Sequence, residues 1–393
     1  MNITKDNINE INKIIDLYKK ELFKDALTLA RTKKFNNLKF KEIPFFNNLV
    51  GLINLSLKDW LEAIKNFKRA ISLDIKFEAA YLNLGITYYD IGELDNSYEN
   101  FLKVLELNKD NKSARDSIIQ LLTFSKMSKL KNCTLKIVNN KIQSLPYEID
   151  FAKKIEDEKI INIYKKAKSI VSKNLPYFDY SSDQIFRRNN IDLNCERHKR
   201  IFNTFDVIPK FCFGCLKIVI NLETVLELIK LSIIFDEYKF LDSFERKCMI
   251  SYSSKGYKGY IYFLSIDDLN KVFKLIVPIV EKNLGTKIKF EAKRGCSEFA
   301  VPYPKYKEIK DNADKMMSYP KEWLIAEKKI DSKIYKDSKI KIRKKKNSLK
   351  GLTLNDFLII DKWLSYAKSI NDKSFQNLLI KTNNEENKTI QLR

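Results

Sequence analysis

The single histidine and five of the six cysteines of the chain fall within one region, and their spacing could hold a metal ion. They are Cys195, His198, Cys212, Cys215, Cys248 and Cys296. In Cys195-x-x-His198 and in Cys212-x-x-Cys215, one turn of chain can bring two ligands toward the same ion. Gly214 gives the second pair the backbone freedom that a tight metal-binding turn needs. The pattern predicts a tetrahedral zinc site built from cysteine and histidine.

The same residues leave other chemistry open. Four thiolates also suit an iron–sulfur cluster, which is the alternative cofactor. Free cysteines are often buried as small apolar groups, and a C-x-x-C pair can be redox-active. A metal-dependent enzyme would need an acid or base beside the metal, and Glu196 and Glu298 are the candidates because they lie close to cysteines in the sequence. Whether the protein is an enzyme stays open.

Arginine is scarce in this chain, because only 11 of the 73 basic residues are arginine. Six of them fall in the cysteine-rich region or just before it: Arg187, Arg188, Arg197, Arg200, Arg246 and Arg294. A guanidinium group can bind phosphate or carboxylate through two parallel hydrogen bonds, which an ammonium group cannot do. We therefore expect an anion-binding edge beside the cysteines. The alternative is structural pairing with nearby carboxylates, namely Glu196, Glu245 and Glu298.

Downstream of the C-F-G-C turn, the sequence alternates between strand-like and helix-like patterns. Strands are expected at 216–222, 246–252, 259–265 and 287–295, and helices at 224–238 and 267–284. This β-α-β-β-α-β order is typical of the ferredoxin-like, or split βαβ, arrangement. The fourth strand then pairs with the first, so Cys296 should lie nearer the C-F-G-C turn than Cys248 does. The expected ligands are Cys212, Cys215 and Cys296, with either Cys195 or His198.

One of the expected strands carries alternating aromatic residues. It reads Lys258-Gly259-Tyr260-Ile261-Tyr262-Phe263, which is similar to the RNP1 box of the RRM family. The resemblance implies that Tyr260 and Tyr262 stack on unpaired RNA bases. The family carries a second aromatic box on the first strand, whereas the segment LKIVINL at 216–222 has no aromatic residue. Alternating Tyr and Ile is also typical of any half-buried strand.

The first third of the chain contains a repeat of 34 residues. The pairs at this spacing are Gly51 and Gly85, Ala63 and Ser97, Phe67 and Phe101, Ala70 and Val104, and Leu73 and Leu107. This period, with Leu84-Gly85, Tyr88 and Gly92 at their offsets, resembles the tetratricopeptide repeat (TPR). The resemblance covers about residues 8–127 and implies an all-α solenoid whose concave groove binds a protein or peptide. Alternatively, the repeats only pack against the rest of the chain.

These features predict a multidomain protein. Residues 1–127 are expected to form the TPR solenoid with a final capping helix, and residues 128–150 a linker. A cysteine-rich α+β domain should follow at 151–305, with its ferredoxin-like core at about 212–300. The last part, 306–393, is expected to be a basic helical tail. Its basic run at 339–346 could contact phosphate or a membrane surface, although such runs are usually solvated.

The composition favours an anionic partner and argues against common nucleotide sites. The net charge is +23, of which residues 1–100 contribute only +1, so the remainder holds +22. A basic excess confined to one part of a chain points to nucleic acid, a phosphorylated ligand or another acidic surface. The 9 glycines form neither the dinucleotide-binding pattern nor the P-loop, so the sequence has no NAD, FAD or ATP motif.

The sequence shows no leader and no apolar run long enough to span a membrane, so we expect a cytoplasmic protein without a transmembrane segment. The predicted function is a TPR protein-interaction scaffold joined to a Cys/His metal-binding α+β domain that binds an anionic ligand, with RNA as the first candidate. The alternative is a metal- or iron–sulfur-dependent enzyme whose substrate is recruited by the TPR groove.

Overall fold

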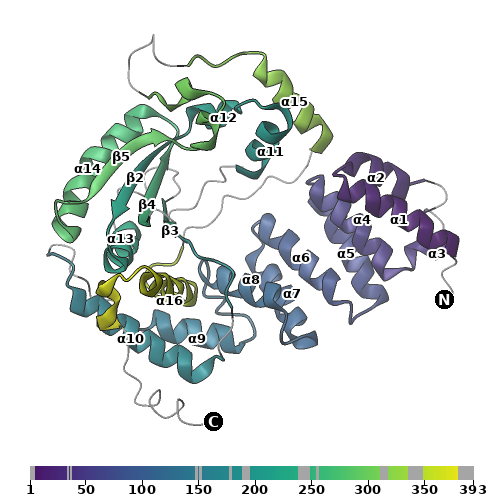
Figure 1. Cartoon of the computed structure of the whole chain (residues 1–393). Helices are drawn as coiled ribbons and strands as arrows, with labels where there is room; N and C mark the ends of the chain where they lie inside the picture. Colours follow the sequence, from purple (N-terminus) through teal and green to yellow (C-terminus); the bar gives the residue numbers. More distant parts are fainter. Residues whose placement is uncertain are drawn as a thin grey trace, which may run out of the picture.

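The computed structural model describes residues 5–32, 35, 38–146, 149, 153–176, 179–187, 195–237, 248–253, 256–309, 317–334 and 348–378. Its first third is helical. The helices are α1 (Lys5–Lys19), α2 (Phe23–Ala30), α3 (Leu38–Lys41), α4 (Pro44–Ser56), α5 (Trp60–Leu73), α6 (Glu78–Asp90), α7 (Leu94–Leu107) and α8 (Lys112–Leu122). Figure 1 shows them following one another along one side of the molecule.

The two clearest repeats are the helix pairs α4/α5 and α6/α7. At Gly51, a Cβ atom would lie 2.5 Å from the ring of Phe67, and at Gly85 it would lie 2.6 Å from the ring of Phe101. Glycine is favoured at both positions because the phenylalanine ring of the partner helix packs directly on this point of the helix. The spacing of 34 residues in the sequence therefore corresponds to the same helix crossing made twice.

The predicted linker at 128–150 contains a helix, α9 (Thr134–Gln143). Leu135, Val138 and Ile142 of this helix are buried. The next helix is α10 (Asp157–Asn174). The expectation of a connection with little structure is therefore wrong for this segment, because its apolar side chains continue the packed core.

A five-stranded antiparallel sheet follows. Its strands are β1 (Ile185–Arg187), β2 (Leu216–Leu222), β3 (Cys248–Ser253), β4 (Gly256–Phe263) and β5 (Lys289–Arg294), in the spatial order β1-β3-β4-β2-β5. Two helices, α13 (Val225–Glu237) and α14 (Ile266–Leu284), connect β2 to β3 and β4 to β5. The order from β2 to β5 is the β-α-β-β-α-β order expected from the sequence. The short edge strand β1 was not expected.

The two connecting helices lie on one face of the sheet. Gly259 of β4 approaches α13 so closely that a Cβ atom there would lie 2.2 Å from Leu231. Alternate residues along β4 are buried, among them Tyr257 and Ile261, whereas Tyr260 and Tyr262 are only partly buried. The second pair therefore lies on the opposite face from α13 and α14.

The C-terminal region contains α15 (Trp323–Ile334) and α16 (Leu354–Ser369). Helix α16 is a core helix rather than part of a tail, because Phe357, Ile360, Trp363 and Leu364 are buried in it. Its apolar residues belong to one cluster that also contains α7, α8, α9, α10 and the helix-covered face of the sheet. The basic run at 339–346 lies outside the described residues.

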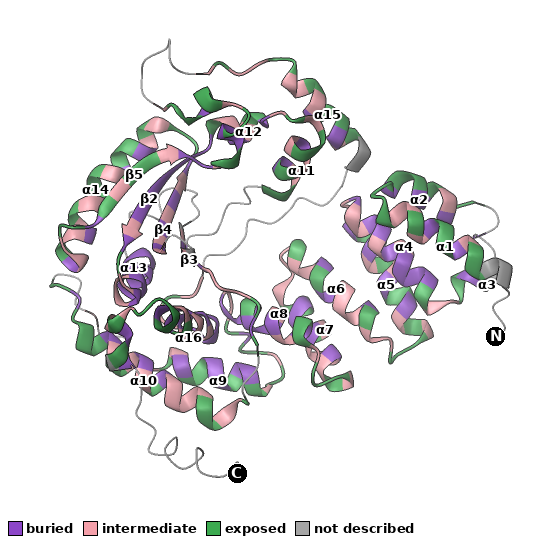
Figure 2. Ribbon diagram, viewed as in Figure 1, coloured by how far each residue is buried: buried purple, intermediate pink, exposed green. Residues whose placement is uncertain are grey.

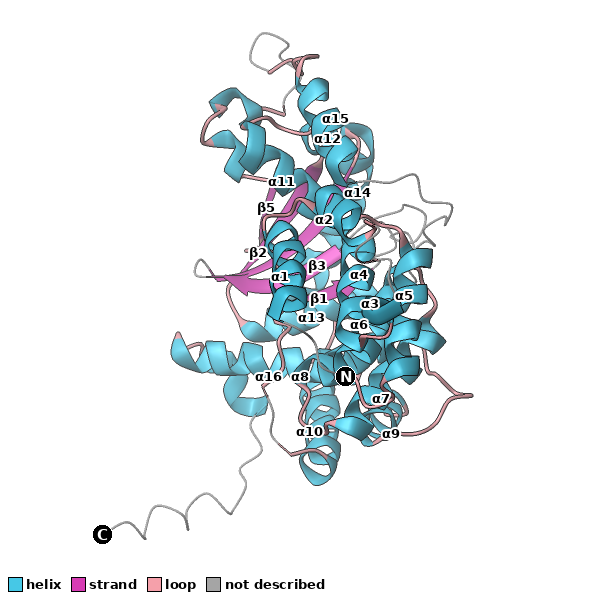
Figure 3. Cartoon of the chain, turned by 90° about the vertical axis from the view of Figure 1, so that its right-hand side faces the viewer, coloured by secondary structure: helices cyan, strands magenta, loops and turns pink. Residues whose placement is uncertain are grey.

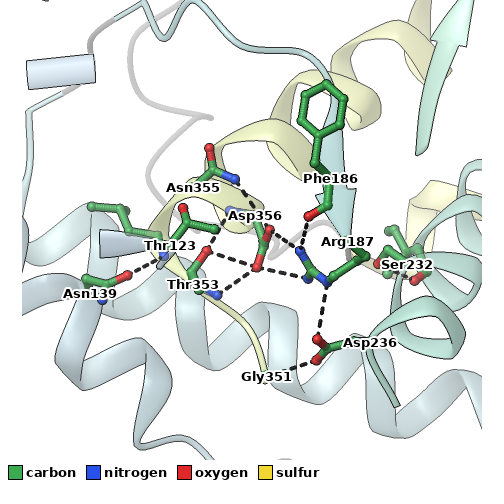
Figure 4. Close-up of polar contacts among 12 residues, drawn as sticks. Thr123, Asn139, Phe186, Arg187, Ser232, Asp236, Gly351, Thr353, Asn355 and Asp356 are labelled. Carbon is green, nitrogen blue, oxygen red and sulfur yellow. Dashed lines mark hydrogen bonds and ion pairs between the residues drawn. The ribbon is translucent and has the colours of Figure 1, made fainter. Parts of the chain in front are cut away.

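Buried polar contacts fix α16 between the last repeat helix and the sheet (Figure 4). Arg187 of β1 donates two hydrogen bonds of 3.1 Å to the carboxylate of Asp356 and forms an ion pair of 3.3 Å with Asp236 of α13. Asp356 also accepts from Thr353 in a capping box at the start of α16. All three charged groups are buried, so removing one of them leaves the charge of its partner buried without compensation.

The chain forms a ring, in which the first helices return to the far end of the sheet (Figure 1). Helix α2 lies against α15, and Lys24 donates to the carbonyl oxygen of Ser332. Figure 2 shows buried residues concentrated in β2, α13 and the inner sides of the repeat helices. Within the described residues, no helix has the length and apolar character needed to cross a membrane.

Candidate functional site

The C-F-G-C sequence forms a tight turn at one end of β2. Residues Lys210–Gly214 make the short helix α12, and the Cys215 N–H donates to the carbonyl oxygen of Cys212 at 3.1 Å. Helix α11 (Cys195–Phe205) lies at the same end of the sheet as α12, as Figures 1 and 3 both show. This turn brings Cys212 and Cys215 to the sheet edge where β5 ends.

Residues at the end of β5 hold the turn in place through its carbonyl oxygens. Arg294 donates to the carbonyl oxygen of Phe213 at 2.7 Å, and the Gly295 N–H donates to that of Cys215 at 2.8 Å. The Tyr306 hydroxyl donates to the carbonyl oxygen of Cys212 at 2.9 Å. These three hydrogen bonds fix the backbone of the turn and thereby position its two thiols.

The backbone pairing brings a third cysteine to the turn. A Cβ atom on Gly295 would lie 2.5 Å from Sγ of Cys215, so only glycine fits beside this sulfur. Cys296 follows directly, and its thiol shares a hydrogen bond with the thiol of Cys212. That hydrogen bond, burial and the nearby thiols of Cys296, Cys215 and Cys195 all raise the pKa of Cys212. The structure thus brings Cys212, Cys215 and Cys296 together, while Cys195 begins α11 at the same end of the sheet.

The other two predicted ligands are placed differently. His198 is buried, and its ring stacks on Phe211 at 5.1 Å between ring centroids. Cys248 begins β3, which is separated from β2 by β4, and its side chain lies outside the described part of the structure. Among the described residues, no group of three or more His, Cys, Asp or Glu side chains has an arrangement that could hold a metal ion as it stands. Metal binding therefore stays a prediction.

The two candidate acid–base residues lie beside this cluster. Glu196 is in the first turn of α11, and Glu298 begins the short 3-10 helix η2 (Glu298–Ala300); both side chains are exposed. Glu298 lies close enough to Lys217 to favour the charged form of that lysine. Their catalytic role stays a prediction, since nothing else in the described residues marks a substrate.

Four of the six predicted anion-binding arginines have described side chains, and each contacts other parts of the chain. Arg187 pairs with Asp356 and Asp236 in the core (Figure 4). Arg197 pairs with Asp331 and Glu327 of α15, and Arg200 with Glu21. Within the described residues, every hydrogen bond that Arg294 donates goes to a backbone carbonyl oxygen. Arg187, Arg197 and Arg200 thus pair with carboxylates, although not with the expected Glu196, Glu245 or Glu298, and Arg188 and Arg246 lie outside the described residues.

With reference to the described helices alone, we call the sheet face opposite α13 and α14 the helix-free face; it meets the cysteines where β2 begins and β5 ends. Tyr260 and Tyr262 lie on it with their ring centroids 6.5 Å apart and their planes 29° apart. Lys217, on the neighbouring strand β2, is buried; it donates to the carbonyl oxygen of Gly295 at 2.7 Å and lies 5.5 Å from the centre of the Tyr260 ring. Burial lowers the pKa of Lys217 and raises that of Tyr262.

Sequence reasoning missed Lys217 and Tyr306. Lys217 is the only charged residue within the apolar strand LKIVINL, which is the signal that could have identified it. It occupies the strand where the RRM family carries its second aromatic box. No sequence pattern indicated Tyr306, because its segment is distant from Cys212 along the chain and only the fold places its hydroxyl beside the Cys212 carbonyl oxygen.

The class of the N-terminal helices follows from their repeat geometry and from family models. A model described as "TPR repeat" matches residues 51–92, and one described as "Tetratricopeptide repeat" matches residues 78–111. Residues 51–111 are therefore tetratricopeptide repeats, which confirms the resemblance found from the sequence. Repeats of this kind are a protein-interaction scaffold.

Three solved structures are similar to part of the chain. The second TPR domain of human RPAP3, in complex with the HSP70 peptide SGPTIEEVD, is 20% identical over 29% of this chain and 92% of that one, with a TM-score of 0.27. The first TPR of Spaghetti (RPAP3), bound to the HSP90 peptide SRMEEVD, is 18% identical over 29% and 88%, with a TM-score of 0.27. The MamA protein is 20% identical over 43% and 78%, with a TM-score of 0.28. No curated protein matches the sequence.

Proposed function

We propose that the protein is a TPR scaffold whose C-terminal module holds a metal ion at the sheet edge and binds an anionic ligand on the adjoining helix-free face. The observation that carries the proposal is the convergence of the C-F-G-C turn with Cys296, from segments far apart in the sequence. The strand order supports a ferredoxin-like core, which brings these segments together. The repeats would recruit the protein or peptide partner.

Zinc is the first candidate metal. Thiolate ligands suit Zn²⁺, and an iron–sulfur cluster is the competing cofactor because it also uses cysteine thiolates. Cys212, Cys215 and Cys296 are the proposed ligands, completed by either Cys195 or His198. Binding requires the thiol contact between Cys212 and Cys296 to give way to metal–sulfur bonds, so the side chains must rotate from their described positions.

Metal analysis of the full chain, purified without oxygen, tests this part. We expect about one zinc per chain and no visible absorption, whereas an iron–sulfur cluster would be coloured. Cys212→Ser should lose the metal. Cys133→Ser is the matched control, because Cys133 lies at the start of α9 in another part of the core. A wild-type chain without metal, together with an unchanged stability of Cys212→Ser, would reject the metal proposal.

Single-stranded RNA is the first candidate for the anionic ligand. Tyr260 and Tyr262 offer ring faces, Lys217 and Lys258 offer positive charge on the same sheet, and the basic excess of the chain lies after residue 100. Stacking of one base on an aromatic ring contributes about 1–3 kcal/mol. Tyr260→Ala should therefore weaken RNA binding by roughly 5- to 150-fold, while Tyr260→Phe keeps the ring and the affinity. Equal RNA binding by the wild type and Tyr260→Ala would refute the proposed stacking of RNA bases on this face.

The recruitment role of the repeats needs a test by substitution rather than deletion. Removing residues 1–127 would also remove α8, which packs in the same core as the sheet. Ile86 is an exposed apolar residue on α6. A peptide selected against the wild-type chain should lose binding to Ile86→Asp and keep it with Ile75→Asp, a substitution in the turn before α6. If both variants bind the peptide as the wild type does, the peptide binds at another place on the chain.

A further inference from the structure

Helix α11 is held across both chain segments that carry the buried thiols. The His198 ring stacks on Phe211, the residue before Cys212, at 5.1 Å between ring centroids. Phe202, one turn later, packs on Phe299 of η2 at 4.6 Å between centroids. These two contacts fix the helix beside the C-F-G-C turn on one side and beside the segment after Cys296 on the other.

The first residue of α11 is Cys195, whose side chain is exposed. Cys195 and His198 are three residues apart, so they lie on the same side of the helix, with Cys195 at its end. The His198 ring already packs on Phe211 in the interior. The contacts of α11 with Phe211 and Phe299 hold this helix beside the C-F-G-C turn, and Cys195 is among the groups that raise the pKa values of Cys212 and Tyr262.

Two buried cations lie beside the thiols, Arg294 over the rings of Phe213 and Tyr306 and Lys217 over the ring of Tyr260. Arg294 and Lys217 are 8% and 9% exposed. Within the described part of the chain, every hydrogen bond that these two side chains donate goes to a neutral carbonyl oxygen. Buried charges are normally paired, because removing them from water is costly. A zinc ion with four thiolates carries a net charge of −2, which would balance both cations.

We propose that Cys195, and not His198, is the fourth ligand, so that Cys195, Cys212, Cys215 and Cys296 form a tetrathiolate zinc site that also fixes α11. The inference rests on the proposed metal binding and decides a question which that proposal leaves open. Each cysteine loses its thiol proton as its sulfur binds the ion, so four protons are released and no electron is transferred. The exposed Cys195 lies on the solvent side, where the ion enters.

The consequence of this ligand set concerns the closure of the ring. Helix α11 also carries Arg197, which pairs with Asp331 of α15 at 2.7 Å, and Arg200, which pairs with Glu21 after α1 at 3.4 Å. A zinc–sulfur bond at the first residue of α11 would therefore strengthen the attachment of the N-terminal helices to the sheet. With His198 as ligand, the exposed end of α11 would stay outside the site.

X-ray absorption on the zinc-loaded wild-type chain tests the ligand set without any variant. We expect four sulfur neighbours at about 2.3 Å, and three sulfurs with one nitrogen would overturn the inference. Competition with a zinc chelator adds a second measurement: Cys195→Ser should weaken zinc binding by about 100-fold or more, since even outer contacts of a metal site contribute about 10- to 100-fold. His198→Gln should change the affinity by less than about 10-fold.

Hydrogen exchange then measures whether zinc binding stabilises the contacts that close the ring. Removing zinc from the wild type, or introducing Cys195→Ser, should speed amide exchange in α11 and α2 and leave α6 unchanged. Arg200→Met should speed exchange in α2 while the zinc-site spectrum stays the same. Equal exchange in α11 with and without zinc would contradict the coupling. A wild-type chain that binds no zinc would instead reject the proposed metal function itself, so the two failures are distinguishable.

Discussion

Replacing Arg187 by methionine tests whether the buried charges of Figure 4 anchor the C-terminal helix. Arg187 is 3% exposed and is the cation that faces both Asp236 and Asp356. Removing one partner of a buried ion pair typically costs about 3–5 kcal/mol, because the other charge stays buried without compensation. Methionine fills similar space, so the lost charge rather than a cavity dominates the effect.

The structure also limits how large the loss can become. Two carboxylates lose their cation, yet each keeps other hydrogen bonds. Asp356 still accepts from the Thr353 backbone and hydroxyl at 3.0 and 2.9 Å, and Asp236 from the Gly351 N–H at 2.7 Å. We therefore expect a loss of about 3–5 kcal/mol in the free energy of unfolding rather than twice that value. Adding Asp236→Asn to Arg187→Met should recover part of it, because one uncompensated charge disappears.

The assay uses the position of the tryptophans. Trp363 is buried on α16, whereas Trp60 lies in the repeats and Trp323 on α15. In a background with Trp60→Phe and Trp323→Phe, guanidinium unfolding followed by fluorescence reports on α16 alone. Arg200→Met is the matched control, since its partner Glu21 is 57% exposed and such pairs contribute about 0–1 kcal/mol.

A loss below about 1 kcal/mol for Arg187→Met would refute this reasoning, because the buried-pair cost would then be missing. Arg187 would return to the set of candidate anion-binding arginines, and its substitution should then lower affinity for the anionic ligand instead. A loss of the expected size with unchanged ligand affinity would assign Arg187 to the fold.

Three further predictions concern other parts of the chain. Gly85→Ala should lower the free energy of unfolding of the repeats by about 1–3 kcal/mol, because its Cβ would lie 2.6 Å from the Phe101 ring; thermal unfolding followed through Trp60 measures it, and an unchanged midpoint would contradict the close crossing. Tyr306→Phe should cost about 1 kcal/mol and speed the reaction of Cys212 with a thiol reagent, because the hydroxyl no longer holds the cysteine carbonyl; equal rates would show that the contact does not order the turn. Burial raises the pKa of Tyr89 from 10.0 to about 12, so the folded state favours the neutral phenol. This contribution to stability is complete below pH 10 and is lost as the pH rises toward 12. Tyr89→Phe should therefore reduce the alkaline loss of stability, measured by unfolding experiments across that range.

Some elements were predictable because a local pattern encodes them. The 34-residue spacing of Gly51 and Gly85 reflects a close helix crossing, which only a small residue permits. The alternation of strand and helix patterns after Cys215 gave the order from β2 to β5. Since that order sets the neighbours of β2, it also predicts that Cys296 lies near the C-F-G-C turn.

Other features depend on partners that are distant in the sequence. An amphipathic pattern marks α16 as a helix but does not say which surface covers its apolar side, so its place in the core could not be read from residues 354–369. Arg187 resembled the other scarce arginines, and its partners, Asp236 and Asp356, lie far along the chain. Strand β1 contains only three residues, too few for a periodic pattern.

The continuous core changes how the parts of this protein can act on one another. One cluster of buried residues extends from Tyr98 of α7 through the helix-covered face of the sheet to Leu378, so the second repeat and this face form a single unit rather than domains joined by a linker. If the second repeat moved independently of the sheet, that core would be exposed to water. The cost in free energy would be proportional to the apolar area exposed. The contacts that join the first helices to α11 and α15 include polar ones, namely the hydrogen bond from Lys24 to Ser332 and the partly exposed pair of Arg200 and Glu21. A relative movement of the first helices and the sheet would therefore cost least on this side of the ring.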